Sequence, residues 1–173
     1  MKCSLKVIVL FLLLLTNAVE ANINIAFIDM DKVLSESKPG SMILNQLKKK
    51  NNEYLKDFIS KEKLLKAKET KLIGQKNILS DAEYELNLNQ LKLDVDNYNK
   101  DRKKIISNFN KLKINNTNKF VKLINEILKE YSDKNSISLI LQKKNLIIGK
   151  NDLDITDKII KIVDIEITEF TIK

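Results

Sequence analysis

Two aspartates, Asp29 and Asp31, are the residues whose spacing could support catalysis in this sequence. They follow the apolar run 23–28 and so lie where a strand would end. The sequence has no histidine and no tryptophan, and its single cysteine is Cys3. This composition excludes Ser-His-Asp and Cys-His catalysis as well as Cys/His zinc sites. The chemistry that remains is carboxylate chemistry with a hard cation such as Mg²⁺.

The Asp29-Met30-Asp31 pair resembles the first motif of haloacid-dehalogenase-type phosphatases, which implies a nucleophile and a general acid beside Mg²⁺. That fold also needs alternating strands and helices, a Ser or Thr at the end of a second strand, a lysine and a later acidic pair. Here about 100 residues of helix-like sequence follow, and the only later acidic loop is 149–154. We therefore expect no enzyme, no metal and no cofactor. The aspartates are interpreted as acceptors at the first turn of a short helix.

The segment 1–21 is typical of a secretory signal peptide. A basic start leads into the apolar run 7–15, and Val19 and Ala21 occupy the −3 and −1 positions of a cleavage site. The apolar run is too short to span a bilayer core of about 30 Å. The sequence therefore predicts export and cleavage after Ala21.

The chain carries a formal charge of +8, and Arg102 is its only arginine. Arginine clusters interleaved with aromatic residues are typical of nucleic-acid binding, because the guanidinium grips phosphate and stacks on bases. Lysines spread along the whole chain do not form such a cluster, so we expect no nucleic-acid partner. They fit either an ordinary solvated surface or one that attracts anionic clients or lipid head groups.

The middle of the chain is predicted to be one long helix folded back once. From Ser41 to Ile148 the only glycine or proline is Gly74. Heptad columns predict a coiled-coil seam, but lysines within it make the seam weak toward Gly74. The columns are Leu44, Asn51, Phe58, Leu65 and Leu72 with Leu47, Tyr54, Lys61 and Lys68, then Tyr84, Leu91, Tyr98, Ile105 and Leu112 with Leu88, Val95, Arg102, Phe109 and Asn116.

The turn of this hairpin is predicted near 74–80. Gly74 can adopt a positive φ and end the outgoing helix. Ser80 and Glu83 have the spacing of a capping box, which would start the returning helix. The arm is therefore expected to span 41–132, with Pro39-Gly40 turning the chain into it.

The two ends of the chain, 22–40 and 133–173, are predicted to form a small β-rich body. Apolar runs at 136–142 and 146–150 predict a hairpin, the N-terminal run adds a third strand, and Asp152 or Asp154 caps a short helix. The tail 165–173 alternates as a strand would. So small a core is marginal alone, so we expect association through the sheet. The candidate body and association core is Ile25, Phe27, Leu139, Leu141 and Ile148.

These features together resemble the Skp (OmpH-like) family of outer-membrane-protein chaperones over essentially the whole mature chain. The resemblance rests on the apolar strand ending in an aspartate, K-V-L-S-E-S, S-K-P-G before the long helix, D-R-K-K, S-I-S-L-I-L and N-D-L-D-I-T-D-K-I-I-K, in that order. It implies an α+β fold: a β-rich trimerisation body with three long helical-hairpin (coiled-coil) arms, a jellyfish-like trimer enclosing a cavity.

The resemblance also implies a function. The family's activity is that of an ATP-independent periplasmic holdase for unfolded outer-membrane β-barrel proteins, working as a homotrimer. A lipopolysaccharide or anionic-membrane site on the arm would fall at Arg102, Lys103 and Lys104. A structural coiled-coil envelope protein, a spacer or anchor without chaperone activity, shares the signal peptide and the arm and stays open as the alternative.

Overall fold

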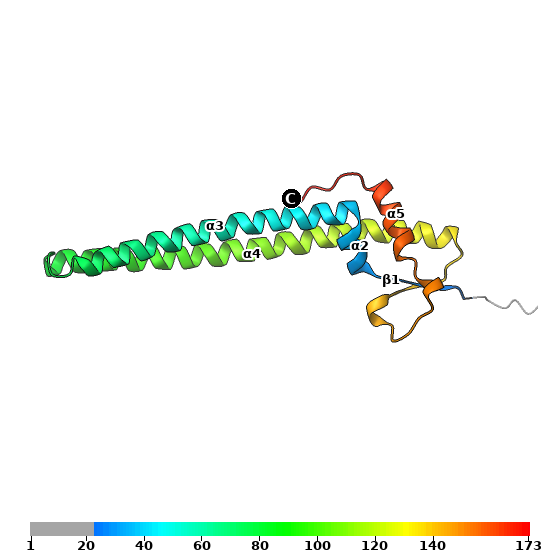
Figure 1. Cartoon of the computed structure of the whole chain (residues 1–173), viewed down its shortest axis with the longest axis horizontal. Helices are drawn as coiled ribbons and strands as arrows, with labels where there is room; N and C mark the ends of the chain where they lie inside the picture. The colour runs from blue at the N-terminus through cyan, green and yellow to red at the C-terminus, as the bar shows by residue number, and fades with distance from the viewer. Residues whose placement is uncertain (1–22) are drawn as a thin grey trace, which may run out of the picture.

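The computed structural model describes residues 23–173, so the expected signal peptide and its cleavage site lie outside the described residues. A long two-helix arm projects from a small body (Figure 1). The elements are β1 (Ile25–Ile28), α2 (Met30–Glu36), α3 (Lys38–Gly74), α4 (Asp81–Lys134), β2 (Leu139–Gln142), the 3₁₀ turns η1 (Lys143–Asn145) and η2 (Asn151–Leu153), and α5 (Thr156–Glu166).

The arm consists of α3 and α4, which lie side by side and antiparallel along most of their length (Figure 1). α3 has 37 residues and α4 has 54. At 1.5 Å per residue these helices are about 55 and about 80 Å long. The extra length of α4 runs past the start of α3 into the body. The predicted pair of long helices is confirmed.

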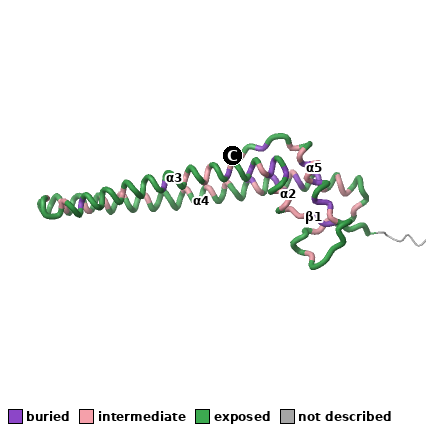
Figure 2. The backbone as a smooth tube through the Cα atoms, viewed as in Figure 1, coloured by how far each residue is buried: buried purple, intermediate pink, exposed green. Residues whose placement is uncertain are grey.

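The seam between α3 and α4 is only partly apolar. Leu47, Phe58 and Leu72 are buried, whereas the lysines at Lys61 and Lys68 are exposed. Figure 2 shows purple, buried backbone concentrated near the body and green, exposed backbone toward the tip. The weak outer seam expected from the heptad columns is therefore present.

Both ends of α3 differ in detail from the sequence prediction. Pro39 and Gly40 lie in its first turn, and the Ser37 hydroxyl accepts from the Gly40 amide, so the helix starts before the expected turn. Gly74 does not adopt a positive φ; the Gln75 amide instead donates to the Lys71 and Leu72 carbonyls. The prediction of a left-handed glycine was wrong because ordinary backbone hydrogen bonds already close this end.

The returning helix begins as predicted. Ser80 caps α4, its hydroxyl accepting from the Glu83 amide, while the Glu83 carboxylate accepts from the Ser80 amide at 3.1 Å. This reciprocal pair satisfies two amides that would otherwise have no partner. The capping box fixes the first residue of α4 because the signal is local.

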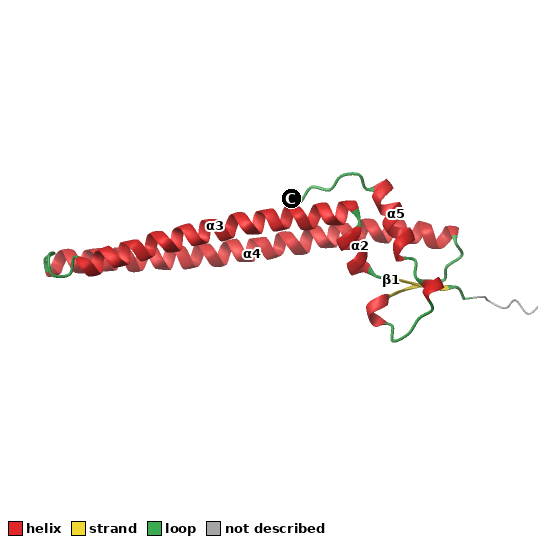
Figure 3. Cartoon of the chain, viewed as in Figure 1, coloured by secondary structure: helices red, strands yellow, loops and turns green. Residues whose placement is uncertain are grey.

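The sheet differs from the prediction, and the body is not β-rich. β1 and β2 form a two-stranded parallel sheet with Ile25 opposite Leu139 and Ile28 opposite Gln142. The predicted hairpin is wrong, because η1 follows β2 directly and 146–150 contains no strand (Figure 3). A single bridge, Phe27 with Asp154, adds to β1 on its other edge.

The core lies where the helices cover this sheet. Val33, Ile43, Ile124, Ile159 and Val163 have no exposed surface. The core cluster takes residues from β1, α2, α3, α4 and α5, and from the tail beyond α5. The body is therefore a helical layer packed on a small sheet.

Candidate functional site

The two aspartates with catalytic spacing both lie at the start of α2. Asp29 is its N-cap: its carboxylate accepts from the Lys32 amide at 3.0 Å, while its own amide donates to the Thr156 hydroxyl. Asp31 is exposed in the first helical turn. Within residues 23–173 no group of three potential metal ligands occurs. Asp29 thus joins the end of β1 to α2 and to the start of α5, whereas Asp31 takes no part in this junction.

A second carboxylate ties the same junction from the other side. Asp154 accepts from the Thr156 amide at 2.9 Å and from the Lys143 ammonium at 3.0 Å. Burial acts to raise the pKa of Asp154, but the hydrogen bonds from the Thr156 hydroxyl, the Thr156 amide and the Lys143 ammonium together hold it below its ordinary value. The predicted cap at Asp152 or Asp154 is therefore wrong by at least one position: the N-cap of α5 is Ile155, which makes no side-chain cap hydrogen bond, and Asp154 binds the first helical amide from outside the helix.

The five predicted body-core residues have different environments. Phe27 is buried: Gly149 packs directly on its ring, where a Cβ would lie 2.8 Å from the nearest ring carbon, and the Lys143 ammonium lies 5.9 Å from its centroid. Leu141 is half-buried. The side chains of Ile25, Leu139 and Ile148 are exposed, Ile148 by 90%. Their role in association stays a prediction, because an association face is exposed in a single chain.

The residues of β1 that pack into the core are Ala26 and Ile28. They lie on the face of the strand opposite to Ile25 and Phe27, the face that was predicted to be buried. Strict alternation assigns one face of a strand to the core. Here residues 26–28 of the short strand are covered on both faces, on one by the helices and on the other by the loop carrying Gly149, and only Ile25 at its start is exposed. A strand buried on both faces gives no alternating signal.

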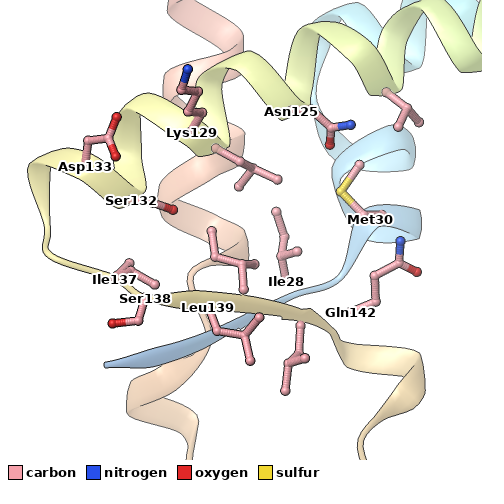
Figure 4. Close-up of a pocket in the computed structure, with 14 residues that line it drawn as sticks. Ile28, Met30, Asn125, Lys129, Ser132, Asp133, Ile137, Ser138, Leu139 and Gln142 are labelled. Atoms are coloured by element: carbon pink, nitrogen blue, oxygen red, sulfur yellow. The ribbon is translucent and has the colours of Figure 1, made fainter. Parts of the chain in front are cut away.

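An open pocket of about 570 Å³ lies between β2 and the end of α4. Figure 4 shows Leu139, Ile137 and Ile28 along its strand side, and Asn125, Lys129 and Asp133 on the α4 side, with Met30 of α2 closing one end. β2 pairs with β1 on one edge, and no described strand pairs with its other edge. Such an edge, beside exposed apolar side chains, is open to pairing with another chain.

The predicted basic cluster on the arm is split by the structure. The Arg102 guanidinium lies 5.5 Å from the Phe58 ring centroid and 3.6 Å from a Glu62 carboxylate oxygen, so α3 already partners its charge. Burial, and then the hydrogen bond to Glu62, raise the pKa of Tyr98 in the same cluster. Lys103 and Lys104 are exposed on α4. Their binding of lipopolysaccharide or an anionic surface stays a prediction.

Large apolar side chains are exposed along the arm, a feature the sequence analysis missed. Nine of them have exposed fractions between 45% at Ile106 and 79% at Ile78. Three of them, Leu86, Leu93 and Ile114, share one heptad column on the side of α4 away from the seam. The nine are Leu55, Ile59, Leu64, Ile73, Ile78, Leu86, Leu93, Ile106 and Ile114.

The pattern of these residues could have been found from the sequence. Outer positions of a coiled coil are normally polar, because they face water. Leucine or isoleucine at such positions over several heptads is therefore a departure from the pattern. We call the nine side chains the exposed arm residues.

Comparison with known proteins assigns this chain to a family. The outer membrane protein (OmpH-like) family matches residues 24–163. The chain belongs to the OmpH-like family. The predicted resemblance to that family is therefore confirmed.

A solved structure supports the fold of this OmpH-like chain. It is that of a proposed outer membrane chaperone (OmpH-like) from Caulobacter crescentus CB15, with a TM-score of 0.75 and 14% sequence identity. The match covers 88% of this chain and 90% of that one. The search of curated proteins gave no significant match. Across residues 23–173, no helix combines the length and apolarity needed to cross a membrane.

Proposed function

We propose that this OmpH-like chain is an ATP-independent holdase of the periplasm that keeps unfolded outer-membrane β-barrel proteins soluble. The observation that carries the proposal is the set of exposed arm residues, which are scattered among lysines on both helices. Membership of the family supports the same activity. Retention of a client would come from many weak contacts, because the arm surface offers dispersed side chains and summed contacts can retain a chain.

The arm suits a client of variable size. Its outer seam is held by polar pairs such as Lys68 with Asp94, at 2.7 Å, rather than by continuous apolar packing. Segments with few buried apolar contacts open locally at low free-energy cost. The arm can therefore bend without unfolding the body. Its positive charge would attract acidic clients and anionic membrane surfaces over about 8 Å at physiological salt.

A homotrimer is part of the proposal. It is supported by the free edge of β2, by the exposed Ile25 and Leu139 beside it, and by the open pocket against α4. Pairing that edge with another copy would cover apolar surface that a lone chain leaves in water. Sedimentation of the processed chain at micromolar concentration should give a trimer, and a clean monomer would contradict this arrangement.

The decisive test is an aggregation assay with an unfolded β-barrel protein diluted from denaturant without nucleotide. A stoichiometric excess of the chain should suppress light scattering. The triple variant Leu86→Gln, Leu93→Gln, Ile114→Gln should lose half or more of that protection, because it removes one column of exposed arm residues. The matched control is Lys100→Gln in the same column, which should retain protection.

The result also decides between holdase and spacer. A structural spacer needs the length of α4 but not its exposed apolar side chains. If the wild-type chain leaves aggregation unchanged at stoichiometric excess, the holdase proposal fails and the spacer is favoured. If the triple variant protects as well as the wild type while circular dichroism shows intact helices, the exposed arm residues are not the client surface.

A further inference from the structure

The tail that follows α5 does not end in solvent but runs back over the base of the arm. It covers residues 167–173, has no helix or strand, and lies along α3 (Figure 1). Its side chains alternate: Phe170 is buried and Ile172 half-buried, whereas Thr171 and Lys173 are exposed. The alternation is that of an extended strand with one face on the arm.

One backbone edge of the tail is held by an amide side chain of α3. The Gln46 amide nitrogen donates to the Phe170 carbonyl at 2.7 Å, and its amide oxygen accepts from the Ile172 amide at 3.3 Å. In an extended chain these two groups, two residues apart, point to the same side. Gln46 therefore contacts the tail as a neighbouring strand would.

The opposite backbone edge is held by an amide side chain of α4. The Asn116 amide nitrogen donates to the Lys173 backbone oxygen at 3.2 Å, and its amide oxygen accepts from the Lys173 amide at 3.3 Å. Asn116 is only 4% exposed and lies in the coiled-coil seam. Its amide nitrogen also donates to Leu112 one turn back, so the tail supplies the remaining partners.

An aromatic slot lies between these two amides. The Phe170 ring packs edge-to-face on Phe120 with 6.2 Å between centroids, and the Lys119 ammonium lies 5.2 Å from the Phe170 centroid. Phe170 itself is 5% exposed. The two amide side chains contact only backbone groups and carry no sequence information, so residue type is selected by the slot around Phe170 and by the core cluster against which Ile172 packs. The site therefore recognises an extended backbone with an apolar, preferably aromatic, residue followed by another apolar residue two positions later.

We propose that this groove of Gln46, Asn116 and Phe120 is a binding site for extended peptide segments of alternating apolar and polar residues, and that tail 167–173 is its resident occupant. The ligand class deepens the proposed holdase function and rests on it, because strands of membrane β-barrels alternate in this way. An incoming segment displaces the tail by forming the same four backbone bonds, as in strand addition. Binding of a client at the base is thereby coupled to release of the tail.

The inference is tested by fluorescence anisotropy with a labelled peptide that has the sequence of residues 167–173. In the full chain the attached tail competes, since tethering gives it a high effective concentration. The full-chain variant Phe170→Ala loosens the tail and should bind the peptide at least tenfold more tightly than the wild type does. The matched control is Thr171→Ala, on the exposed face of the same tail, which should behave as the wild type.

A second variant identifies the groove. Gln46→Ala, placed in the Phe170→Ala chain, should weaken peptide binding at least tenfold. Because Gln46 is only half-buried, we expect the substitution to leave the fold intact. A labelled peptide with alanine at the aromatic position should bind the Phe170→Ala chain at least tenfold more weakly. Equal binding by wild type and Phe170→Ala, or binding that ignores Gln46, would overturn the site.

Competition tests the ligand class. An unlabelled peptide of alternating phenylalanine and threonine should displace the labelled one, and a scrambled peptide with its apolar residues clustered should not. If only a peptide with the tail sequence competes, the groove binds the tail specifically and the inference is wrong. These assays need no aggregation readout, so an absent holdase activity and an absent peptide site are distinguishable.

Discussion

The base of the arm and its outer part use the same two helices but are stabilised differently. At the base, Phe120, Ile124 and Ile43 are almost fully buried, because α2, α5 and the tail cover the helix pair. In the outer arm, which we define as residues 54–109, all of them described, only Phe58 and Leu72 among the apolar residues are buried. Two helices alone enclose little core, since most side chains between them keep one side in water.

The outer arm replaces apolar packing with paired polar groups. Lys68 contacts Asp94, and Arg102 contacts Glu62 across the seam. Exposed ion pairs of this kind contribute about 0–1 kcal/mol each. The body therefore supplies most of the stability, while few contacts hold the two helices of the outer arm together. This division suits a rigid support carrying a compliant surface.

The largest expected effect comes from removing a core ring at the base. Phe120→Ala should lower the free energy of unfolding by about 3–5 kcal/mol, because Phe120 is 1% exposed and its loss leaves a cavity. Phe58→Ala is the matched outer-arm variant and should cost less, since water can fill its site from the open side. Guanidinium denaturation followed by circular dichroism at one fixed protein concentration measures both, and equal losses would contradict the comparison.

Two glycines, one at the base and one at the tip, lie in opposite packing environments. A Cβ at Gly40 would lie 2.1 Å from the Leu34 carbonyl oxygen, which is rigid backbone, whereas a Cβ at Gly74 meets no atom within 4 Å. Gly40→Ala should therefore destabilise the body by about 1–3 kcal/mol through overpacking. Gly74→Ala should instead stabilise the outer arm by about 0.5–1 kcal/mol, because alanine loses less entropy in a helix.

Thermal unfolding of both variants and of the wild type checks this prediction. The two melting temperatures should move in opposite directions. A decrease of similar size for Gly74→Ala would mean that the tip needs its glycine for a conformation other than the right-handed one it shows.

The parts of the fold that follow from local chemistry could be predicted from the sequence. The cap at Asp29, the capping box at Ser80 and Glu83, and the long unpunctuated arm each depend on residues within a few positions of one another. Their signals are therefore complete within a short window. The pairing of β1 with β2 is different, because both long helices lie between Ile25 and Leu139 in the sequence.

The features that the sequence did not predict are those settled by packing between distant segments. The run 146–150 has the composition of a strand, but it crosses beneath Phe27, where Gly149 allows close contact. The tail alternates as a strand does, but its partners are side chains of Gln46 and Asn116, more than fifty residues away. No periodicity within the tail could identify amides on two other helices.

The smallest expected effect is the response of the outer arm to acid. The hydrogen bonds from Ser80 hold the pKa of Glu83 below its ordinary value, and those from Lys68 and Gln90 do the same for Asp94. A carboxyl whose pKa is lower in the folded state stabilises that state above its unfolded pKa of about 4, and this contribution is lost as the pH falls through the folded value. Acidification from pH 6 to pH 3 should therefore loosen residues 72–98 before the base.

Hydrogen exchange, corrected for the intrinsic rate at each pH, measures this response. Protection of amides at 72–98 should fall on acidification, while protection at 120–128 holds, because that part of α4 is covered by apolar side chains. Asp94→Asn should reproduce part of the loss at neutral pH and reduce the remaining pH response. An equal loss of protection in both regions would mean that the arm opens only together with the body. The proposed bending of the outer arm would then require the body to unfold as well.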